Sequence, residues 1–118
     1  MGLICTHTLD GTITSINPAA SLSLGREEQE LIGRPLSAIL PPDRRMHLHA
    51  YLAKIKEDLS DSGVMELVAS DGSRRFWAYH NVLDTEADPP YVLGHAQDIT
   101  TQHLQEQQLQ ELAIRDPL

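Results

Sequence analysis

Short β-branched runs at the start of the chain predict two paired strands. The runs cover residues 4–9 and 12–17, and Asp10-Gly11 separates them. Asp-Gly favours the positive backbone angles of a tight hairpin, so we expect the two strands to be antiparallel neighbours. Asn17-Pro18 ends the second strand, because proline suits the first turn of a helix.

Three helices are predicted next, two of them short. Residues 18–24 and 26–31 form short helical pieces, which glycine and proline end. A longer helix is predicted over 43–59, with Asp61-Ser62-Gly63 ending it. Its apolar residues recur at the spacing of one helix face and form a single stripe: Leu48, Leu52, Ile55 and Leu59.

The second half of the chain predicts three strands and a terminal helix. Strands over 64–69 and 74–83 flank Asp71-Gly72, a second hairpin signal, and a last strand covers 91–97. From Thr101 onward Gln, Glu and Leu dominate, which favours a helix to the end of the chain. The fold class is therefore α+β: a five-stranded antiparallel sheet with helices on one face and a C-terminal helix.

Several short sequences resemble those of PAS domains. The front half contains Leu-Asp-Gly-Thr-Ile at 9–13, Asn-Pro-Ala-Ala at 17–20 and Leu-Ile-Gly-Arg-Pro-Leu at 31–36. Asp98-Ile99-Thr100 is similar to the sequence that closes many PAS domains. The resemblance implies a PAS sensory domain over residues 1–100, followed by a signalling helix over 101–118.

The end of the chain resembles a junction into a catalytic domain. Residues 113–118, Ala-Ile-Arg-Asp-Pro-Leu, are similar to the segment that precedes a GGDEF (diguanylate cyclase) domain. We therefore expect this chain to be part of a longer protein that regulates such an output domain. Asp98, Ile99 and Thr100 are then the predicted signal relay between the last strand and the helix.

Composition excludes several classes of partner. The chain has 118 residues, enough for one domain, and 9 basic against 17 acidic residues give a net charge of −8. This charge disfavours nucleic acids and anionic membranes as partners. The single cysteine, Cys5, forbids an intrachain disulfide and agrees with a reducing compartment. With no apolar run long enough for a membrane span, we expect a cytoplasmic protein.

The sequence contains no enzyme motif. Glycine-rich phosphate loops, His-Glu-x-x-His, Gly-x-Ser-x-Gly and paired cysteines are all absent. We therefore predict no catalytic residues and a regulatory role.

One strand predicts a pocket for a small molecule. Alternation over 74–83 places Trp77, Tyr79 and Asn81 on one face. The resemblance implies that this face meets the helices. Small residues would leave room beside the polar groups of the aromatic rings. The candidate pocket residues are Tyr51, Trp77, Tyr79, Asn81, Gly94 and Ala96. The alternative is that these side chains simply fill the core.

Haem is an alternative ligand. His47 and His49 lie on the helix that carries the axial ligand in haem-binding PAS domains, and Arg44-x-x-His47 resembles the pattern there. At about 100° per residue, however, the two histidines lie on opposite flanks of the apolar stripe. As i, i+2 neighbours they cannot share one metal ion.

The strand residues bear on two further possibilities, a histidine cluster and a flavin site. His7, His80 and His95 fall on three strands that the resemblance makes neighbours, so they could cluster as a zinc site or a pH-sensitive patch. The simpler interpretation is three half-exposed strand histidines. Flavin is disfavoured, because Cys5 is on the first strand and Ala96 stands where photoactive flavin domains have Gln.

The terminal helix predicts a weak dimer contact. Seven-residue spacing leaves only Leu109 and Leu112 at seam positions, too few for an autonomous coiled coil. We expect a homodimer with the output domain on the same chain. The alternative is a ligand-free interaction module.

Overall fold

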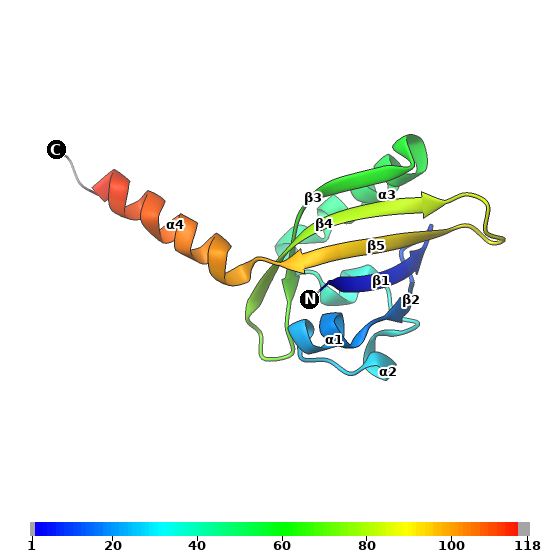
Figure 1. Ribbon diagram of the computed structural model, residues 1–118, viewed down its shortest axis with the longest axis horizontal. Helices are drawn as coiled ribbons and strands as arrows, with labels where there is room; N and C mark the ends of the chain where they lie inside the picture. Colours follow the sequence, from blue (N-terminus) through cyan, green and yellow to red (C-terminus); the bar gives the residue numbers. More distant parts are fainter. Residues whose placement is uncertain (1, 116–118) are drawn as a thin grey trace.

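Five strands form one antiparallel sheet in the order β2-β1-β5-β4-β3 (Figure 1). The structure is a computed structural model that describes residues 2–115, with only the backbone for 114 and 115. The strands are β1 (Leu3–Thr8), β2 (Ile13–Ile16), β3 (Ser60–Val68), β4 (Arg74–Asp84) and β5 (Tyr91–Asp98). Because β5 lies between β1 and β4, the last strand joins the two halves of the sheet.

The helices between β2 and β3 pack on one face of this sheet, as predicted. They are α1 (Pro18–Leu24), α2 (Glu28–Leu31) and α3 (Met46–Asp58), with 3-10 turns η1 (Leu36–Ile39) and η2 (Pro42–Arg44) before α3. In Figure 1, α4 (Thr100–Arg115) projects away from the sheet at the end of β5. Residues 116–118 of the predicted junction lie outside the described part of the chain.

Asn17 fixes α1 to the sheet. Its side-chain oxygen accepts hydrogen bonds from the backbone N–H of Ala20 and of Ile4, both at 3.0 Å. Its amide nitrogen donates to the Gly2 carbonyl at 3.0 Å. One N-cap residue therefore accepts from a backbone N–H of α1 and from one of β1, and so connects the helix to the strand.

The predicted long helix is shorter than expected. Two prolines hold the chain in the η2 turn, so α3 begins at Met46 instead of residue 43. Residues 61–63, predicted to end the helix, belong to β3. The helix ends at Leu59, which adopts a left-handed conformation with φ 67° and donates its N–H to Ile55 at 2.9 Å.

The predicted apolar stripe of α3 is also shifted. Tyr51 and Ile55 are its buried residues, Leu48 and Leu52 are half-buried, and Leu59 is 47% exposed. Tyr51, which is not part of the predicted stripe, faces the sheet one turn before Ile55. The left-handed turn at Leu59 carries that side chain away from the core.

The core lies between the helices and one face of the sheet. The buried apolar residues are Leu3, Ile13, Ile16, Ala20, Leu24, Leu31, Leu36, Ile39, Leu40, Tyr51, Ile55, Leu67, Trp77, Val92 and Ala96. On the opposite face Ile4, Val82 and Leu93 are between 40 and 45% exposed. The sheet is therefore dry on one side and partly open on the other.

The strained turn after α3 gives a stability prediction. We expect Leu59→Gly to raise the free energy of unfolding by about 1 kcal/mol, because glycine adopts the left-handed conformation without the Cβ clash. Urea denaturation measures this change. Leu59→Ala keeps the clash and serves as the control. Equal or lower stability of the glycine variant would show that the turn is not strained.

Candidate ligand groove and signalling junction

A chain of hydrogen bonds crosses the interior from β4 to β1. The Nδ1 atom of His7 lies 2.7 Å from the Thr8 carbonyl, which can only accept, so Nδ1 carries the proton. The Nε2 atom then accepts from the Tyr51 hydroxyl at 2.7 Å. The hydroxyl oxygen in turn accepts from the Asn81 amide at 2.6 Å. Every group in this chain is satisfied while His7 is neutral.

Burial keeps the hydrogen-bonded side chains of His7 and Tyr51 uncharged. It lowers the pKa of His7, although the Thr8 carbonyl and the charge of Asp10 act in the opposite direction. Burial also raises the pKa of the Tyr51 hydroxyl. Both rings therefore stay neutral near pH 7, and the sheet and α3 are joined by a polar but uncharged contact.

A second polar group lies beside it, at the end of α3. Asp61 accepts from the Tyr79 hydroxyl at 2.6 Å and from Lys54 at 2.7 Å. Burial works against ionisation of Asp61, but these two hydrogen bonds outweigh it and hold its pKa below the usual range. The Tyr79 ring meets Tyr51 edge-on at 5.9 Å between centroids.

The structure brings the six predicted pocket residues together around a very small cavity. Tyr51, Trp77, Tyr79, Asn81, Gly94 and Ala96 all line it. Its volume is about 30 Å³, enough for about one water molecule and not for an organic ligand. Gly94 is part of this close packing, since a Cβ there would lie 2.9 Å from the Asn81 side-chain oxygen.

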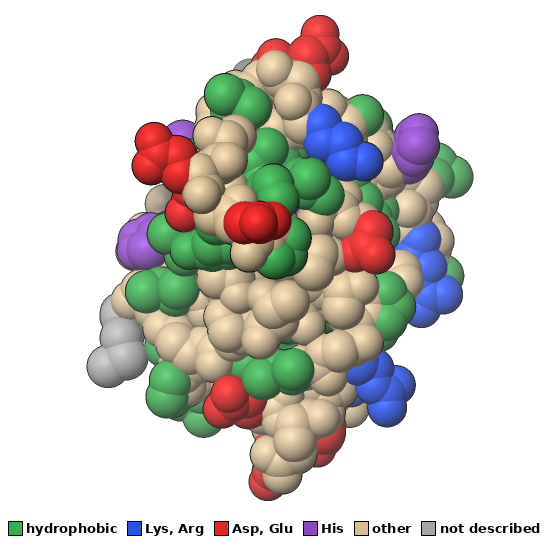
Figure 2. Space-filling model, turned by 90° about the vertical axis from the view of Figure 1, so that its right-hand side faces the viewer, with side chains coloured by type: hydrophobic (Ala, Val, Ile, Leu, Met, Phe, Trp, Pro, Cys, Tyr) green, Lys and Arg blue, Asp and Glu red, His purple; other side chains and the backbone are tan. Residues whose placement is uncertain are grey.

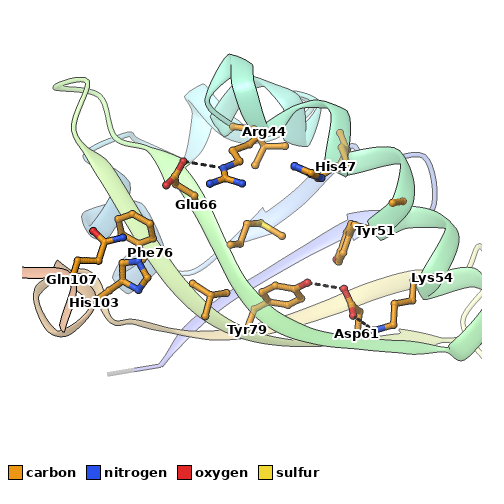
Figure 3. Close-up of a pocket in the computed structure, with 15 residues that line it drawn as sticks. Arg44, His47, Tyr51, Lys54, Asp61, Glu66, Phe76, Tyr79, His103 and Gln107 are labelled. Atoms are coloured by element: carbon orange, nitrogen blue, oxygen red, sulfur yellow. Dashed lines mark hydrogen bonds and ion pairs between the residues drawn. The ribbon is translucent and has the colours of Figure 1, made fainter. Parts of the chain in front are cut away.

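A much larger groove of about 680 Å³ lies between α3, β3 and the start of α4 (Figure 3). Of the predicted pocket residues only Tyr51 and Tyr79 border it. The groove is lined by Leu40, Arg44, His47, Leu48, Ala50, Tyr51, Lys54, Asp61, Val64, Met65, Glu66, Phe76, Tyr79, His103 and Gln107. His103 and Gln107 come from α4, and no pattern in the sequence could place them beside α3.

The carboxylates of this groove are paired. Glu66 binds Arg74 at 2.6 Å and Arg44 at 3.3 Å, and Asp61 binds Lys54. In Figure 3 the Arg44–Glu66 pair lies apart from the Lys54–Asp61 pair, and apolar and aromatic side chains also line the groove. A ligand would therefore meet an apolar surface bounded by hydrogen-bonding groups, an arrangement typical of small-molecule sites.

Asp98 joins α1, β4 and α4 through hydrogen bonds. One of its oxygens accepts from the backbone N–H and hydroxyl of Thr100, at 2.9 and 2.5 Å. The other accepts from Ser23 at 2.7 Å, and Trp77 donates to the Ser23 hydroxyl at 3.0 Å. Burial disfavours the charge, but the bonds from Thr100 and Ser23 outweigh it and hold the pKa of Asp98 below its usual range.

Phe76 holds the first turn of α4 against β4. Its backbone N–H donates to the Thr100 hydroxyl at 3.0 Å, and its carbonyl accepts from the Ile99 N–H at 2.8 Å. Its ring stacks on His103 at 4.1 Å between centroids. The three predicted relay residues therefore lie where α4 is attached to the sheet.

The histidines are dispersed. His7 points into the core, whereas His80 and His95 are exposed and lie opposite each other on the outer face. The possible cluster of these three does not form, because strand alternation places His7 on the other side of the sheet. The favoured interpretation, three half-exposed histidines, is wrong for His7, which is buried. Among the described side chains no group of three or more His, Cys, Asp or Glu could hold a metal ion.

The two proposed haem ligands also differ. Both are exposed, but only His47 borders the groove. Haem binding stays a prediction, with His47 as the better placed ligand.

Comparison with protein families identifies the chain. A profile of the PAS fold matches residues 1–104. This chain belongs to the PAS family. A PAS domain is a regulatory and signalling module, not a catalytic one, as the sequence predicted. No curated protein matches this one.

Solved structures give the same fold. A PAS domain from Colwellia psychrerythraea shares 19% identity with a TM-score of 0.75, covering 85% of this chain and 87% of that chain. A PAS domain of an HTR-like protein from Haloarcula marismortui shares 21% identity with a TM-score of 0.73, covering 83% and 81%. A domain of a sensory box sensor histidine kinase/response regulator from Geobacter sulfurreducens shares 18% identity with a TM-score of 0.72, covering 82% of both chains.

Two further observations concern the helices and one face of this PAS domain. No described helix is long and apolar enough to cross a membrane. Figure 2 shows the end of the molecule away from α4, where Lys and Arg side chains are separated instead of forming a continuous basic patch.

Removing the Tyr51 hydroxyl should destabilise this PAS domain. In Tyr51→Phe, His7 loses its donor and Asn81 loses its acceptor inside the core, so we expect a loss of about 2 kcal/mol in urea denaturation. Tyr91→Phe is the control, because the Tyr91 hydroxyl makes no hydrogen bond among the described residues. Equal losses in both variants would contradict the role of the buried chain.

The pKa of His7 predicts a pH effect. Because the folded pKa is lower than the unfolded value near 6.5, protonation favours unfolding. The stability from neutral His7 is present above pH 6.5 and is lost as the pH falls below it, by at most about 1.4 kcal/mol per pH unit. Urea denaturation at pH 7.5 and 5.5 should show a larger loss for the wild type than for His7→Gln. Equal losses in the wild type and in His7→Gln would contradict the assignment of the pH effect to His7.

Proposed function

We propose that this PAS domain binds a small molecule in the groove between α3, β3 and α4, and that binding changes how α4 is held. One observation carries the proposal: His103 and Gln107, from the first two turns of α4, form part of the groove wall. A molecule lying in the groove would contact the body of the domain and the signalling helix together.

The few contacts that attach α4 favour a change in its position on ligand binding. Beyond Thr100 its described side chains are exposed, apart from a half-buried His103. An isolated helix of this length is marginal in water, so α4 depends on the contacts of Asp98, Thr100 and Phe76 at its start. A ligand shifts the position of α4 only by its different affinity for the two arrangements.

The proposed output is a diguanylate cyclase domain on the C-terminal side. Support comes from the resemblance of residues 113–118 to the junction before GGDEF domains. In this proposal residues 1–100 sense the signal, residues 101–118 transmit it, and the protein acts in the cytoplasm.

A second candidate function is a homodimeric interaction module. Val82 and Leu93 are opposite each other in the sheet register, and Ile4 lies on the same partly exposed face. Sedimentation at several concentrations tests it: a concentration-dependent dimer supports this function, and a monomer throughout removes it. An added-haemin absorption spectrum of wild type and His47→Ala tests the haem alternative in the same samples.

Filling the groove should abolish ligand binding. Ala50 is exposed on α3 and borders the groove, so Ala50→Trp should block it. Ala53 is exposed on the same helix but does not border the groove, and Ala53→Trp is the matched control. We expect compounds of a soluble fragment library to raise the melting temperature of wild type and Ala53→Trp, but not of Ala50→Trp. If no compound separates the two variants, the groove is not the ligand site.

Loss of the Asp98 carboxylate should loosen α4. We expect Asp98→Ala to raise amide hydrogen exchange of residues 101–107 about fivefold or more, because a capping interaction is worth about 1 kcal/mol. Asp71 makes a similar local turn with Ser73 in the hairpin between β3 and β4, and its side chain makes no hydrogen bond to α4 among the described residues. Asp71→Ala should leave exchange in α4 unchanged. Unchanged exchange in Asp98→Ala would remove Asp98 from the relay.

A further inference from the structure

We propose that the ligand of this groove is a small aromatic carboxylate, bound through Arg44 and His47. This inference rests on the proposed function of the groove and specifies its ligand. In Figure 3 the side chains of Arg44 and His47 extend from η2 and α3 into the same space, opposite Phe76 and Tyr79.

Arg44 has N–H donors that no described residue accepts from. Its Nε atom binds Glu66 at 3.3 Å and lies 3.9 Å from Asp43. Its two terminal nitrogens have no hydrogen-bond partner among the described residues, and the side chain is 49% exposed. The planar fork of a guanidinium matches the two oxygens of a carboxylate, which makes it a suitable receptor for that group.

The negative groups near this fork are already neutralised. Glu66 is shared by Arg44 and Arg74, and Asp43 contacts Arg74 at 3.3 Å. Asp61 is held by Lys54 at the other end of the groove. His47 borders the groove and makes no hydrogen bond among the described residues. A carboxylate beside Arg44 therefore meets N–H donors instead of an unpaired negative charge.

The walls of the groove suit a flat apolar body. Tyr51 and Tyr79 meet edge-on at 5.9 Å, and Phe76 stacks on His103 at 4.1 Å. Leu48 and other aliphatic side chains also line the groove. Aromatic rings pack favourably against such edges and faces. The volume of about 680 Å³ lies within the range of about 300–1,000 Å³ for small-molecule sites.

The test compares phenylacetate with phenylacetamide. The two molecules have the same ring and nearly the same shape, but only the first carries a charge. Isothermal titration calorimetry measures both affinities, and ¹⁵N chemical shifts of the full 118-residue chain locate the binding site. We expect phenylacetate to bind at least about tenfold more tightly than the amide, because hydrogen bonds to charged groups are the stronger ones. The shifts should include His103 and Gln107.

Two variants separate the carboxylate contact from the rest of the groove. Arg44→Gln should reduce phenylacetate affinity at least about tenfold and leave phenylacetamide unchanged. Arg34 is exposed, does not border the groove, and its side chain makes no hydrogen bond among the described residues. Arg34→Gln should therefore bind both probes like the wild type.

The failures are distinguishable. Equal affinity for both probes at the groove, unchanged by Arg44→Gln, overturns the carboxylate proposal and leaves the groove as a ligand site. Shifts confined to residues outside the groove, or no binding of either probe at millimolar concentration, overturn the carboxylate proposal. If in addition the fragment screen finds no compound blocked by Ala50→Trp, the proposed function fails as well.

Discussion

The hydrogen bonds that meet at Asp98 and Thr100 are the constraint on which the geometry of this PAS domain depends. Through them the end of β5, the end of α1 and the start of β4 are held at fixed distances from α4. The Thr100 hydroxyl both donates to Asp98 and accepts from the Phe76 backbone. One oxygen atom therefore belongs to the cap of α4 and to the contact of α4 with β4. In the proposed function, a shift in the sheet would act on the helix directly through these bonds.

The interior of the domain is closed by polar side chains that satisfy one another. The chain from Asn81 through Tyr51 to His7 occupies the volume between the sheet and α3, and leaves about 30 Å³ empty. Opening that volume to a ligand would break buried hydrogen bonds, each costly to leave unmade. The groove on the other side of Tyr51 and Tyr79 is already open and requires no such loss.

The proposed ligand groove and the attachment of α4 have a residue in common. The groove touches α3 at His47, β4 at Phe76 and α4 at His103. Since Phe76 also contacts Thr100 through its backbone, one residue belongs to the groove wall and to the attachment of α4. A ligand that moves the Phe76–His103 stack acts on the same bonds that position the helix.

The sequence by itself determined the strands, their hairpins, the α+β class and the fact that Trp77 and Asn81 share a face, because these follow from local alternation and turn residues. It also located the junction at Asp98, because a helix start needs a polar cap. Only the tertiary structure decided that Leu59 leaves the core, that His7 faces away from His80, and that the six predicted residues pack almost without space. The groove depends on α4, which begins at Thr100, lying against α3 and β3, which end at Asp58 and Val68. Local sequence patterns carry no information on a contact between elements so far apart in the chain.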